Sequence, residues 1–471
     1  MTDETTRSAV RSWIEEHQEE MLADLMALMR IDSSAGEPEE GAPFGLGVKR
    51  VFDEMAGILK RSGFSPIDYD GCCMAADFSD APKELDILCH LDVVPGQEGW
   101  QVTEPFVPRI LDGQLYGRGS SDDKGPAVAA LYALRAIREL GLPMEKSARL
   151  ILGGCEESGD EDMERYYRDE PYAPCTISPD SDFPVVNVEK GIMGIIFTGE
   201  VQDDQVESGV KVLSLHAGLA PNMIPSLAEA KVLGLDERAA EMAVAEAERD
   251  GLSVSMENGG DALTVTVTGT GCHASTPELG VNALTGLLRL LEGLDLDRGS
   301  EGAVRALNRL FPFGESNGRS LGVEMSDETA GALTLAFTVL HWEDGALTGK
   351  IDARTPLCTA EEICLEPAVS ALEKAGFRVL EAHMAKPHYI PADSPLVQTL
   401  LASYEAVTGV RKEPRAIGGC TYIHGFPNAA AFGCMEPEVD NRIHGQDEFI
   451  DIDHLLDCAC ILAEAILRIC G

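Results

Sequence analysis

A histidine and an aspartate stand two residues apart at the end of an apolar run, an arrangement that could support chemistry. The run is Leu85–Leu91, which contains His90; Asp92 follows it, and a Pro95-Gly96 turn closes the segment. Short apolar runs bounded by turn residues are typical of buried strands, and ligands of open α/β sheets bind beyond the carboxyl ends of the strands. A carboxylate beside an imidazole supports a metal-binding histidine. Taken alone, however, a histidine at a strand end is more often structural than a ligand.

Four further segments carry groups of the kind that bind metals. These groups are Asp122 and Asp123 in 116–126, Glu156 and Glu157 in 150–159, Asp180 in 178–184, and His444 in 442–448. Imidazole and carboxylate ligands suit Zn²⁺ or Mn²⁺ at hydrolytic sites. Two metals close together need a bridging carboxylate and a base for the attacking water, and an adjacent glutamate pair can supply a ligand and that base.

Each segment also has an ordinary structural explanation. The alternatives are a tight turn at Gly117–Gly119, a helix cap at Asp122-Asp123, a solvated loop at Glu156-Glu157 and a capping role for His444. No single motif decides between the two interpretations. The number of metal-type groups at predicted strand ends and loops favours a metal centre.

The predicted elements that would position these groups alternate between strand and helix. Helical patterns cover 7–30 and a stretch ending near Arg61; strands are expected at 85–91, 148–153 and 175–178, with a helix at 124–140 between the first two. The pattern returns near the end, with helices at 396–408 and 452–469, a Gly-rich turn at 417–420 and a strand at 428–432. Alternating strands and helices predict a largely parallel sheet.

The middle of the chain has a different pattern. Strands are expected at 191–199, 211–216, 262–268, 332–340 and 346–353, with helices such as 226–233 and 282–294 between them. This order predicts an inserted α+β region with a mainly antiparallel sheet. Two stretches, 212–233 and 263–291, share a predicted order of strand, turn and helix, which hints at an internal duplication.

Composition restricts the class of protein. The chain has 471 residues, 44% of them hydrophobic, and a formal net charge of −43, which argues against nucleic acid and anionic membranes as partners. No stretch is long and apolar enough to cross a membrane, and the start lacks the pattern of a secretory signal. Thirteen cysteines in a chain of this length indicate reduced, mostly buried thiols, and we expect a cytoplasmic protein.

The motifs resemble those of the dinuclear metallopeptidase family that includes carboxypeptidase G, carnosinase, aminoacylase and succinyl-diaminopimelate desuccinylase. The matching residues are His90-x-Asp92, Gly117-Arg118-Gly119-x-x-Asp122-x-Lys124-Gly125, Glu156-Glu157 and His444. The longer segments 120–126, 156–159 and 178–184 are similar to those of PepV-type dipeptidases. The resemblance covers most of the chain, with motifs from about residue 85 to 450.

The resemblance implies a role for each matching residue of the metal centre. It implies metal ligation by His90, Asp122, Glu157, Asp180 and His444. Asp122 would bridge two divalent ions, Zn²⁺ in first place with Mn²⁺ or Co²⁺ as alternatives, and its bond to Asp123 would be cis. Asp92 would orient His90, and Glu156 would be the general base that activates a metal-bound water.

The resemblance also implies contributions from the inserted region. His273 would stabilise the oxyanion, Asn222 would contact substrate, and Arg354 would hold a substrate carboxylate. Gly418, Gly419 and Thr421 match the Gly-rich loop near that carboxylate. Relatives commonly have arginine where this chain has His424, which leaves substrate preference at that end open.

The expected fold is α/β: a mixed, largely parallel sheet flanked by helices, with an inserted α+β lid domain. The expected boundaries are 1–184 and 392–471 for the catalytic domain and 185–391 for the lid domain. The expected partner is a small peptide substrate, and the long insertion predicts a monomer, with a dimer as the alternative.

The leading hypothesis is hydrolysis of dipeptides. The rivals are an N-acyl-amino-acid amidohydrolase with the same centre, a catalytically inactive metal-binding protein, and a thiol hydrolase that uses Cys89 or Cys155.

Overall fold

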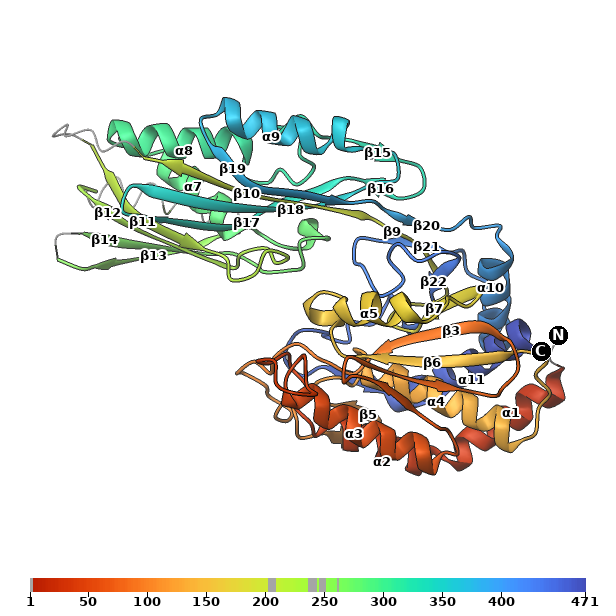
Figure 1. Ribbon diagram of the computed structural model, residues 1–471. Helices are drawn as coiled ribbons and strands as arrows, with labels where there is room; N and C mark the ends of the chain where they lie inside the picture. Colours follow the sequence, from red (N-terminus) through yellow and green to blue (C-terminus); the bar gives the residue numbers. More distant parts are fainter. Residues whose placement is uncertain (1–2, 202–208, 236–243, 245–250, 261) are drawn as a thin grey trace. The chain divides into compact units, whose positions relative to one another are not determined.

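The computed structural model describes residues 3–201, 209–235, 244, 251–260 and 262–471. The chain divides into two compact units, each with its own sheet (Figure 1). Unit 1 comprises Met1–Val188, His388–Arg415 and Cys420–Gly471, and unit 2 comprises Glu189–Pro387 and Ala416–Gly419. The short return of 416–419 to unit 2 was not expected from the sequence. That unit 2 is an inserted lid domain stays a prediction.

Unit 1 is built on a mixed sheet. Its strands, in spatial order, are β1 (Ile67–Tyr69), β2 (Cys73–Asp77), β6 (Ser147–Gly153), β3 (Lys83–His90), β7 (Cys175–Ser178), β22 (Ala429–Ala431), β9 (Val186–Glu189) and β20 (His388–Tyr389), with β21 (Arg415–Ile417) beside β9. The four central strands β6, β3, β7 and β22 run parallel to one another, whereas β1, β2 and β9 pair antiparallel. The predicted mixed, largely parallel sheet is confirmed.

Helices cover both faces of this sheet (Figure 1). They are α1 (Glu4–Glu16), α2 (Gln18–Met29), α3 (Leu46–Arg61), α4 (Lys124–Glu139), α5 (Glu161–Asp169), α10 (Pro395–Thr408) and α11 (Ile452–Cys470). Along β3, Leu85, Ile87 and Cys89 join the large core with α4 and α11, whereas Leu88 faces a smaller cluster with Met163 of α5. Because alternate residues of a strand point to opposite faces, both faces are apolar.

The helix predicted over 7–30 is two helices. His17 separates α1 from α2: its backbone leaves the helical conformation, with φ −104° and ψ 10°. The His17 ring stacks on Trp13 at a centroid distance of 3.8 Å, and its Nδ1 lies 2.7 Å from the Trp13 carbonyl oxygen. A side chain that competes for a backbone carbonyl favours a break of this kind.

Shorter elements complete unit 1 and its loops. They are β4 (Arg109–Leu111), β5 (Gln114–Tyr116), β24 (Phe449–Asp451), β8 (Ser181–Asp182), β23 (Cys434–Met435) and the 3₁₀ helix η1 (Glu156–Ser158). The strands β24, β5 and β4 form one small sheet, and β23 pairs with β8 in another.

Unit 2 is built on an eight-stranded sheet in which the strand pairs are antiparallel. Its order is β13 (Ser253–Asn258), β14 (Leu263–Thr268), β12 (Leu227–Leu233), β11 (Lys211–Ala217), β17 (Thr334–Glu343), β18 (Ala346–Thr355), β10 (Gly191–Glu200) and β19 (Arg378–Ala385). The helices α7 (Ala283–Glu292), α8 (Arg298–Leu310) and α9 (Leu365–Lys374) lie along one face (Figure 1). Other short elements are β15 (Ser326–Asp327), β16 (Gly331–Ala332), η3 (Pro277–Leu279) and η4 (Glu361–Ile363).

The helix predicted over 226–233 is wrong, because this segment is strand β12. Leu, Ala, Glu and Lys all favour helices, but Ala228, Ala230 and Val232 are fully buried at alternate positions. Pairing with β11 on one side and β14 on the other overrides the local propensity. The hinted duplication therefore fails, since 212–233 lacks the helix that α7 supplies in 263–291.

Within the described residues, we find no helix with the length and apolar character needed to span a bilayer.

Candidate metal centre

The candidate ligands gather where parallel strands of unit 1 end. His90 is the last residue of β3, Glu156 and Glu157 follow β6 in η1, and Asp180 follows β7. Because β3 is parallel to both β6 and β7, their carboxyl ends meet at one edge of the sheet. The sheet thus brings together residues from three separate segments of sequence.

Two groups of potential ligands share one aspartate. His90, Asp122 and Asp180 form the first group, and Asp122, Glu157 and His444 form the second. His90 Nε2 lies 2.9 Å from Asp122 Oδ1 and 3.6 Å from Asp180 Oδ2. His444 Nε2 lies 2.9 Å from Asp122 Oδ2 and 3.2 Å from Glu157 Oε1. Each carboxylate oxygen of Asp122 therefore faces a different group, as a bridging ligand requires.

The loop that carries Asp122 is held by a buried glutamate that the sequence analysis missed. Glu448 accepts hydrogen bonds from the backbone N–H groups of 119, 121 and 122, at 3.2, 3.0 and 3.3 Å. It also pairs with Arg118 Nη1 at 2.7 Å, and Arg118 Nη2 donates to the Gly445 carbonyl beside His444. Glu448 and Arg118 together connect the loops of two candidate ligands. The Asp122-Asp123 peptide bond is cis, as the resemblance implied.

The Asp92 carboxylate forms hydrogen bonds with the loop that carries Glu156 and Glu157, and its contact with the His90 ring is longer. Its carboxylate oxygens accept the backbone N–H groups of Glu156 and Glu157, at 3.3 and 3.1 Å. The His90 Nδ1 atom is 3.0 Å from the Asp92 carbonyl oxygen and 3.5 Å from its Oδ1. The closer partner of the ring is thus the main chain of Asp92, while the carboxylate anchors η1.

A second anchor of the same loop is Asp162 in α5, which the sequence did not reveal. Its Oδ2 accepts the N–H groups of Gly154 and Cys155 at 2.7 and 2.9 Å and the Tyr422 hydroxyl at 2.5 Å. The Tyr422 ring meets the His90 ring edge-on at 6.2 Å. Glycine is required at 153, since a Cβ atom there would lie 2.0 Å from the Tyr422 hydroxyl.

The centre concentrates negative charge where it is shielded from water. Burial raises the pKa of Glu156 well above its usual value, against the effect of His90, and nearby Asp180 and Glu157 raise it further. Burial lowers the pKa of the His444 imidazole. The hydrogen bonds and negative charges of Asp122 and Glu157 have the larger, opposite effect and raise this pKa to about 11. Carboxylates this close repel one another unless positive charge lies among them.

These residues fit a pair of divalent cations. The donors are imidazole nitrogens and carboxylate oxygens, the set that Zn²⁺ and Mn²⁺ accept. Ligand atoms about 2.0–2.2 Å from one zinc ion stand roughly 3.3–3.6 Å apart around a tetrahedron, close to the separations of 2.9–3.6 Å found here.

In unit 2, the structure brings His273 and Asn222 onto adjacent, paired segments. The Ala274 N–H donates to the Asn222 carbonyl at 2.8 Å, and Met223 and His273 form a β-bridge. His273 Nδ1 lies 2.6 Å from the Ser275 hydroxyl oxygen, and the Ser275 N–H donates to it at 3.2 Å. When Nδ1 is the acceptor in both contacts, a neutral imidazole carries its proton on Nε2.

Arg354 lies in β18 of unit 2 and already has partners. Its Nε and Nη2 atoms pair with the two Asp352 carboxylate oxygens at 2.9 and 3.1 Å, and Nη1 donates to the Gly418 carbonyl at 3.1 Å. A Cβ atom at Gly418 would lie 2.7 Å from Ser275 Cβ, so glycine permits this close approach. Among the described residues, three of the five guanidinium N–H groups have hydrogen-bond partners, which leaves two for a ligand.

The Gly-rich loop divides between the units. Gly418 and Gly419 belong to unit 2, whereas Thr421 belongs to unit 1, where it is buried. The Thr421 carbonyl accepts the N–H of half-buried His424 at 3.0 Å.

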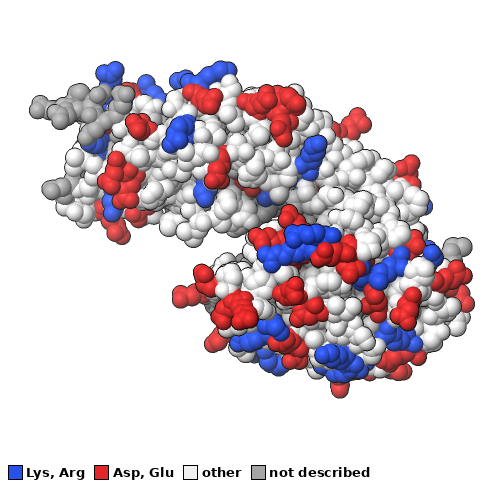
Figure 2. Space-filling view, in the orientation of Figure 1, with Lys and Arg blue, Asp and Glu red and all other residues white. Residues whose placement is uncertain are grey.

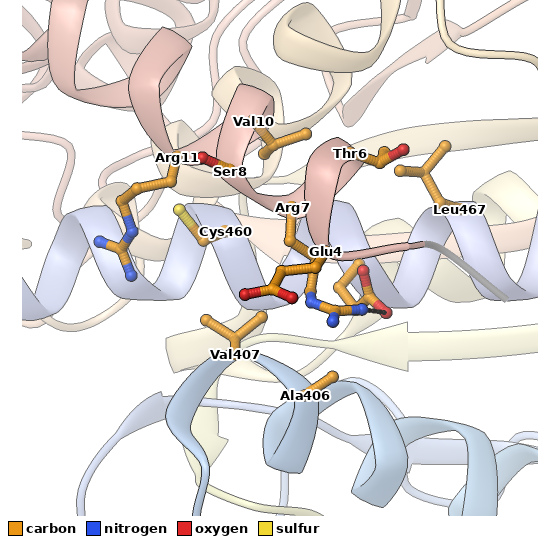
Figure 3. A pocket seen from close by; sticks show the side chains of 11 residues that line it. Glu4, Thr6, Arg7, Ser8, Val10, Arg11, Ala406, Val407, Cys460 and Leu467 are labelled. Atoms are coloured by element: carbon orange, nitrogen blue, oxygen red, sulfur yellow. Dashed lines mark ion pairs between the residues drawn. The ribbon is translucent and has the colours of Figure 1, made fainter.

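A pocket elsewhere in unit 1 is not part of this centre. It measures about 210 Å³ and lies among α1, α10 and α11 (Figure 3). Arg7 pairs across it with Glu464 at 3.9 Å. The predicted site residues, all of which the structure describes, lie outside its lining.

Comparisons with known proteins agree with the fold. Residues 87–468 match the sequence profile described as peptidase family M20/M25/M40. The chain is 32% identical over 461 residues to "Putative dipeptidase YtjP" of Bacillus subtilis, covering 96% of this chain and 97% of the relative. It is 30% identical over 464 residues to "Putative dipeptidase SAB1611c" of Staphylococcus aureus, covering 97% and 98%.

Solved structures share the fold at low sequence identity. Human carnosine dipeptidase 1 has a TM-score of 0.62 at 17% identity, with 98% of each chain covered. The di-peptidase Dug1p of Saccharomyces cerevisiae has a TM-score of 0.58 at 14% identity, again with 98% of each chain covered. The match of the family profile over most of the chain, with relatives 30% or more identical over nearly their full lengths, shows that this chain belongs to the peptidase family M20/M25/M40.

Proposed function

We propose that this metallopeptidase is a dipeptidase whose centre holds two divalent ions, Zn²⁺ in first place and Mn²⁺ or Co²⁺ as alternatives. The observation that carries the proposal is the pair of ligand groups that share Asp122, with Glu156 beside them. Relatives at 32% and 30% identity carry dipeptidase names. Thirteen free cysteines support a cytoplasmic location, where thiols stay reduced.

Divalent ions bound at His90, Asp122, Glu157, Asp180 and His444 would lower the pKa of a water molecule and polarise the scissile carbonyl. Glu156 would accept the proton of that water and pass it to the leaving amine. A general base works best with a pKa near the working pH, and burial of Glu156 shifts its pKa in that direction. Asp92 and Asp162 would keep the base in place through backbone hydrogen bonds to 154–157.

The residues of unit 2 would recognise and polarise the substrate. The Nε2–H group of His273 would donate to the oxyanion that forms from the scissile carbonyl. Asn222, on the paired segment, would contact the substrate. Arg354 would hold the terminal carboxylate with its remaining N–H groups, together with the loop of Gly418, Gly419 and Thr421. Closure of unit 2 over the substrate would limit its length to short peptides.

Thiol chemistry receives no support from the structure. Cys89 and Cys155 are both buried, and burial raises the pKa of each thiol. A nucleophilic cysteine needs the opposite shift.

The test measures hydrolysis of Ala-Ala, β-Ala-His and N-acetyl-Ala by metal-stripped protein after addition of Zn²⁺, Mn²⁺ or Co²⁺. We expect metal-restored cleavage of free dipeptides. Cleavage of N-acetyl-Ala alone would replace the dipeptidase with a deacylase. No cleavage with two metals bound would indicate a binding protein, and activity that survives chelation but not alkylation would indicate a thiol enzyme.

A further inference from the structure

Two histidines face each other across neighbouring strands of the sheet of unit 2. His216 in β11 pairs directly with His341 in β17, and on its other side His216 pairs with Glu229 in β12. Directly opposed residues in antiparallel strands have Cβ atoms about 4.5–5.5 Å apart. The three side chains therefore form a row across β12, β11 and β17.

This row lies on the sheet face opposite α7 and α8. The neighbours of the histidines in sequence, Leu215, Leu340 and Trp342, are buried in the apolar core beneath those helices. His216 is half-buried, and the His341 side chain is 61% exposed. Because alternate residues point to opposite faces, the packed core fixes the strands while the imidazoles remain accessible.

The Nδ1 atoms of the two imidazole rings face each other. His216 Nδ1 lies 2.8 Å from His341 Nδ1, and the ring centroids are 4.4 Å apart. Two nitrogens that bind one zinc ion at about 2.0–2.1 Å stand roughly 3.3 Å apart in tetrahedral geometry. The rings would need to separate by only about half an ångström.

Carboxylates stand at both ends of the pair. Glu343 Oε2 lies 3.7 Å from His341 Nε2, and half-buried Glu229 lies beside His216 in the strand register. Two imidazoles with a carboxylate suit Zn²⁺ and neighbouring divalent transition metals, whereas Ca²⁺ and Mg²⁺ prefer oxygen donors alone.

We propose that His216 and His341 form an accessory binding site for a divalent transition-metal ion such as Zn²⁺, held between their Nδ1 atoms. Glu229 is the candidate third ligand, and Glu343 would support the His341 ring at Nε2. The site is separate in sequence and in structural unit from the centre at Asp122, and it does not depend on peptidase activity.

The experiment loads the Asp122 centre with Zn²⁺, removes unbound metal and titrates further Zn²⁺ by calorimetry. The histidine side chains are followed by NMR in the same titration. The variants are His216→Ala and His341→Ala, and His383→Ala is the matched control, since His383 is an exposed histidine in β19 of the same sheet.

We expect one additional Zn²⁺ to bind to the wild-type protein and to His383→Ala, with resonance shifts at His216 and His341. Loss of a supporting hydrogen-bond partner lowers metal affinity roughly 10- to 100-fold. Because each imidazole is a proposed ligand, His216→Ala or His341→Ala should lower the affinity for the additional Zn²⁺ by more than this. No additional binding to the folded wild-type protein, or equal binding to His341→Ala, would overturn the proposal. Glu229→Gln then tests the third ligand, and Glu343→Gln tests the support of the His341 ring at Nε2.

Discussion

At the residue scale, Glu156 differs from the other carboxylates of the centre. It belongs to neither group of potential ligands, yet it adjoins the candidate ligand Glu157 in η1. Burial and the charges of Asp180 and Glu157 raise its pKa. A carboxylate that holds a proton readily and is not needed to bind metal is suited to proton transfer.

We expect Glu156→Gln to reduce kcat by about 10²- to 10⁴-fold, the usual contribution of general acid–base catalysis, with unchanged metal content. Steady-state hydrolysis of Ala-Ala and metal analysis measure the two effects. The control is Glu161→Gln, at an exposed side chain in the first turn of α5. Near wild-type turnover by the metal-loaded Glu156→Gln variant would refute the assignment of the base.

The cysteines of unit 2 offer a test of burial at single residues. Cys358 is exposed, whereas burial raises the pKa of the Cys364 thiol to about 11. At pH 8 roughly one Cys364 in a thousand is a thiolate, and this fraction rises as the pH approaches 11. We expect iodoacetamide to label Cys358 first in the folded protein. Peptide mass spectrometry over time measures this, and equal rates without denaturant would contradict the burial of Cys364.

At the element scale, the loop between β5 and α4 depends on a residue more than 300 positions later. The Glu448 carboxylate is fully buried and receives backbone N–H groups from the segment that carries Asp122. Its partner Arg118 is buried as well. This arrangement fixes the backbone of a bridging candidate without contributing a ligand.

We expect Glu448→Gln to weaken metal binding and activity by about 10- to 100-fold, as loss of a positioning partner does. Stability should also fall by about 3–5 kcal/mol, because Arg118 loses its buried counter-charge. Metal titration and denaturant unfolding measure these effects. Glu438→Gln, at an exposed side chain near Lys412, is the control. Full metal affinity in the Glu448→Gln variant would show that the loop holds its shape without this carboxylate.

At the scale of the whole molecule, negative charge is abundant. The formal net charge is −43, and acidic side chains are spread over the visible surface of the described residues (Figure 2). At the ends of the parallel strands, the fold gathers several largely buried carboxylates with the buried imidazole of His90 and the partly exposed imidazole of His444. The folded state at that place should therefore gain most from bound cations.

We expect removal of divalent metal to lower the unfolding temperature, and its return to raise it. A ligand at 100 times its Kd stabilises the folded state by about 2.7 kcal/mol when the unfolded chain does not bind it. Calorimetry of chelated and reloaded protein measures the shift. Asp122→Asn removes the charge and one oxygen of the candidate bridging carboxylate, so this variant should lose most of the shift. An equal shift in Asp122→Asn would place the stabilising ions elsewhere.

The sequence alone determined which residues could bind metal and which strands precede them. The candidate ligands follow apolar runs or lie in loops next to predicted elements; they are His90, Asp122, Glu157, Asp180 and His444. This pattern is local in sequence, so it can be recognised without knowledge of distant contacts. The same local information identified most strands and helices of unit 1 and supported the mixed α/β fold.

Tertiary structure decided what local patterns could not. The strand β12 replaced a predicted helix because its edges pair with β11 and β14, and the helix-forming residues Ala228 and Ala230 lie in a sheet core. Glu448 accepts hydrogen bonds from a segment distant in sequence, and Asp162 accepts them from the loop that precedes its own helix. Neither contact can be read from the local sequence. The row of His216 and His341 exists only because β11 and β17 pair in one register. Apart from proline, local propensity differs by about one kcal/mol per residue at most, so packing and pairing over a whole element prevail.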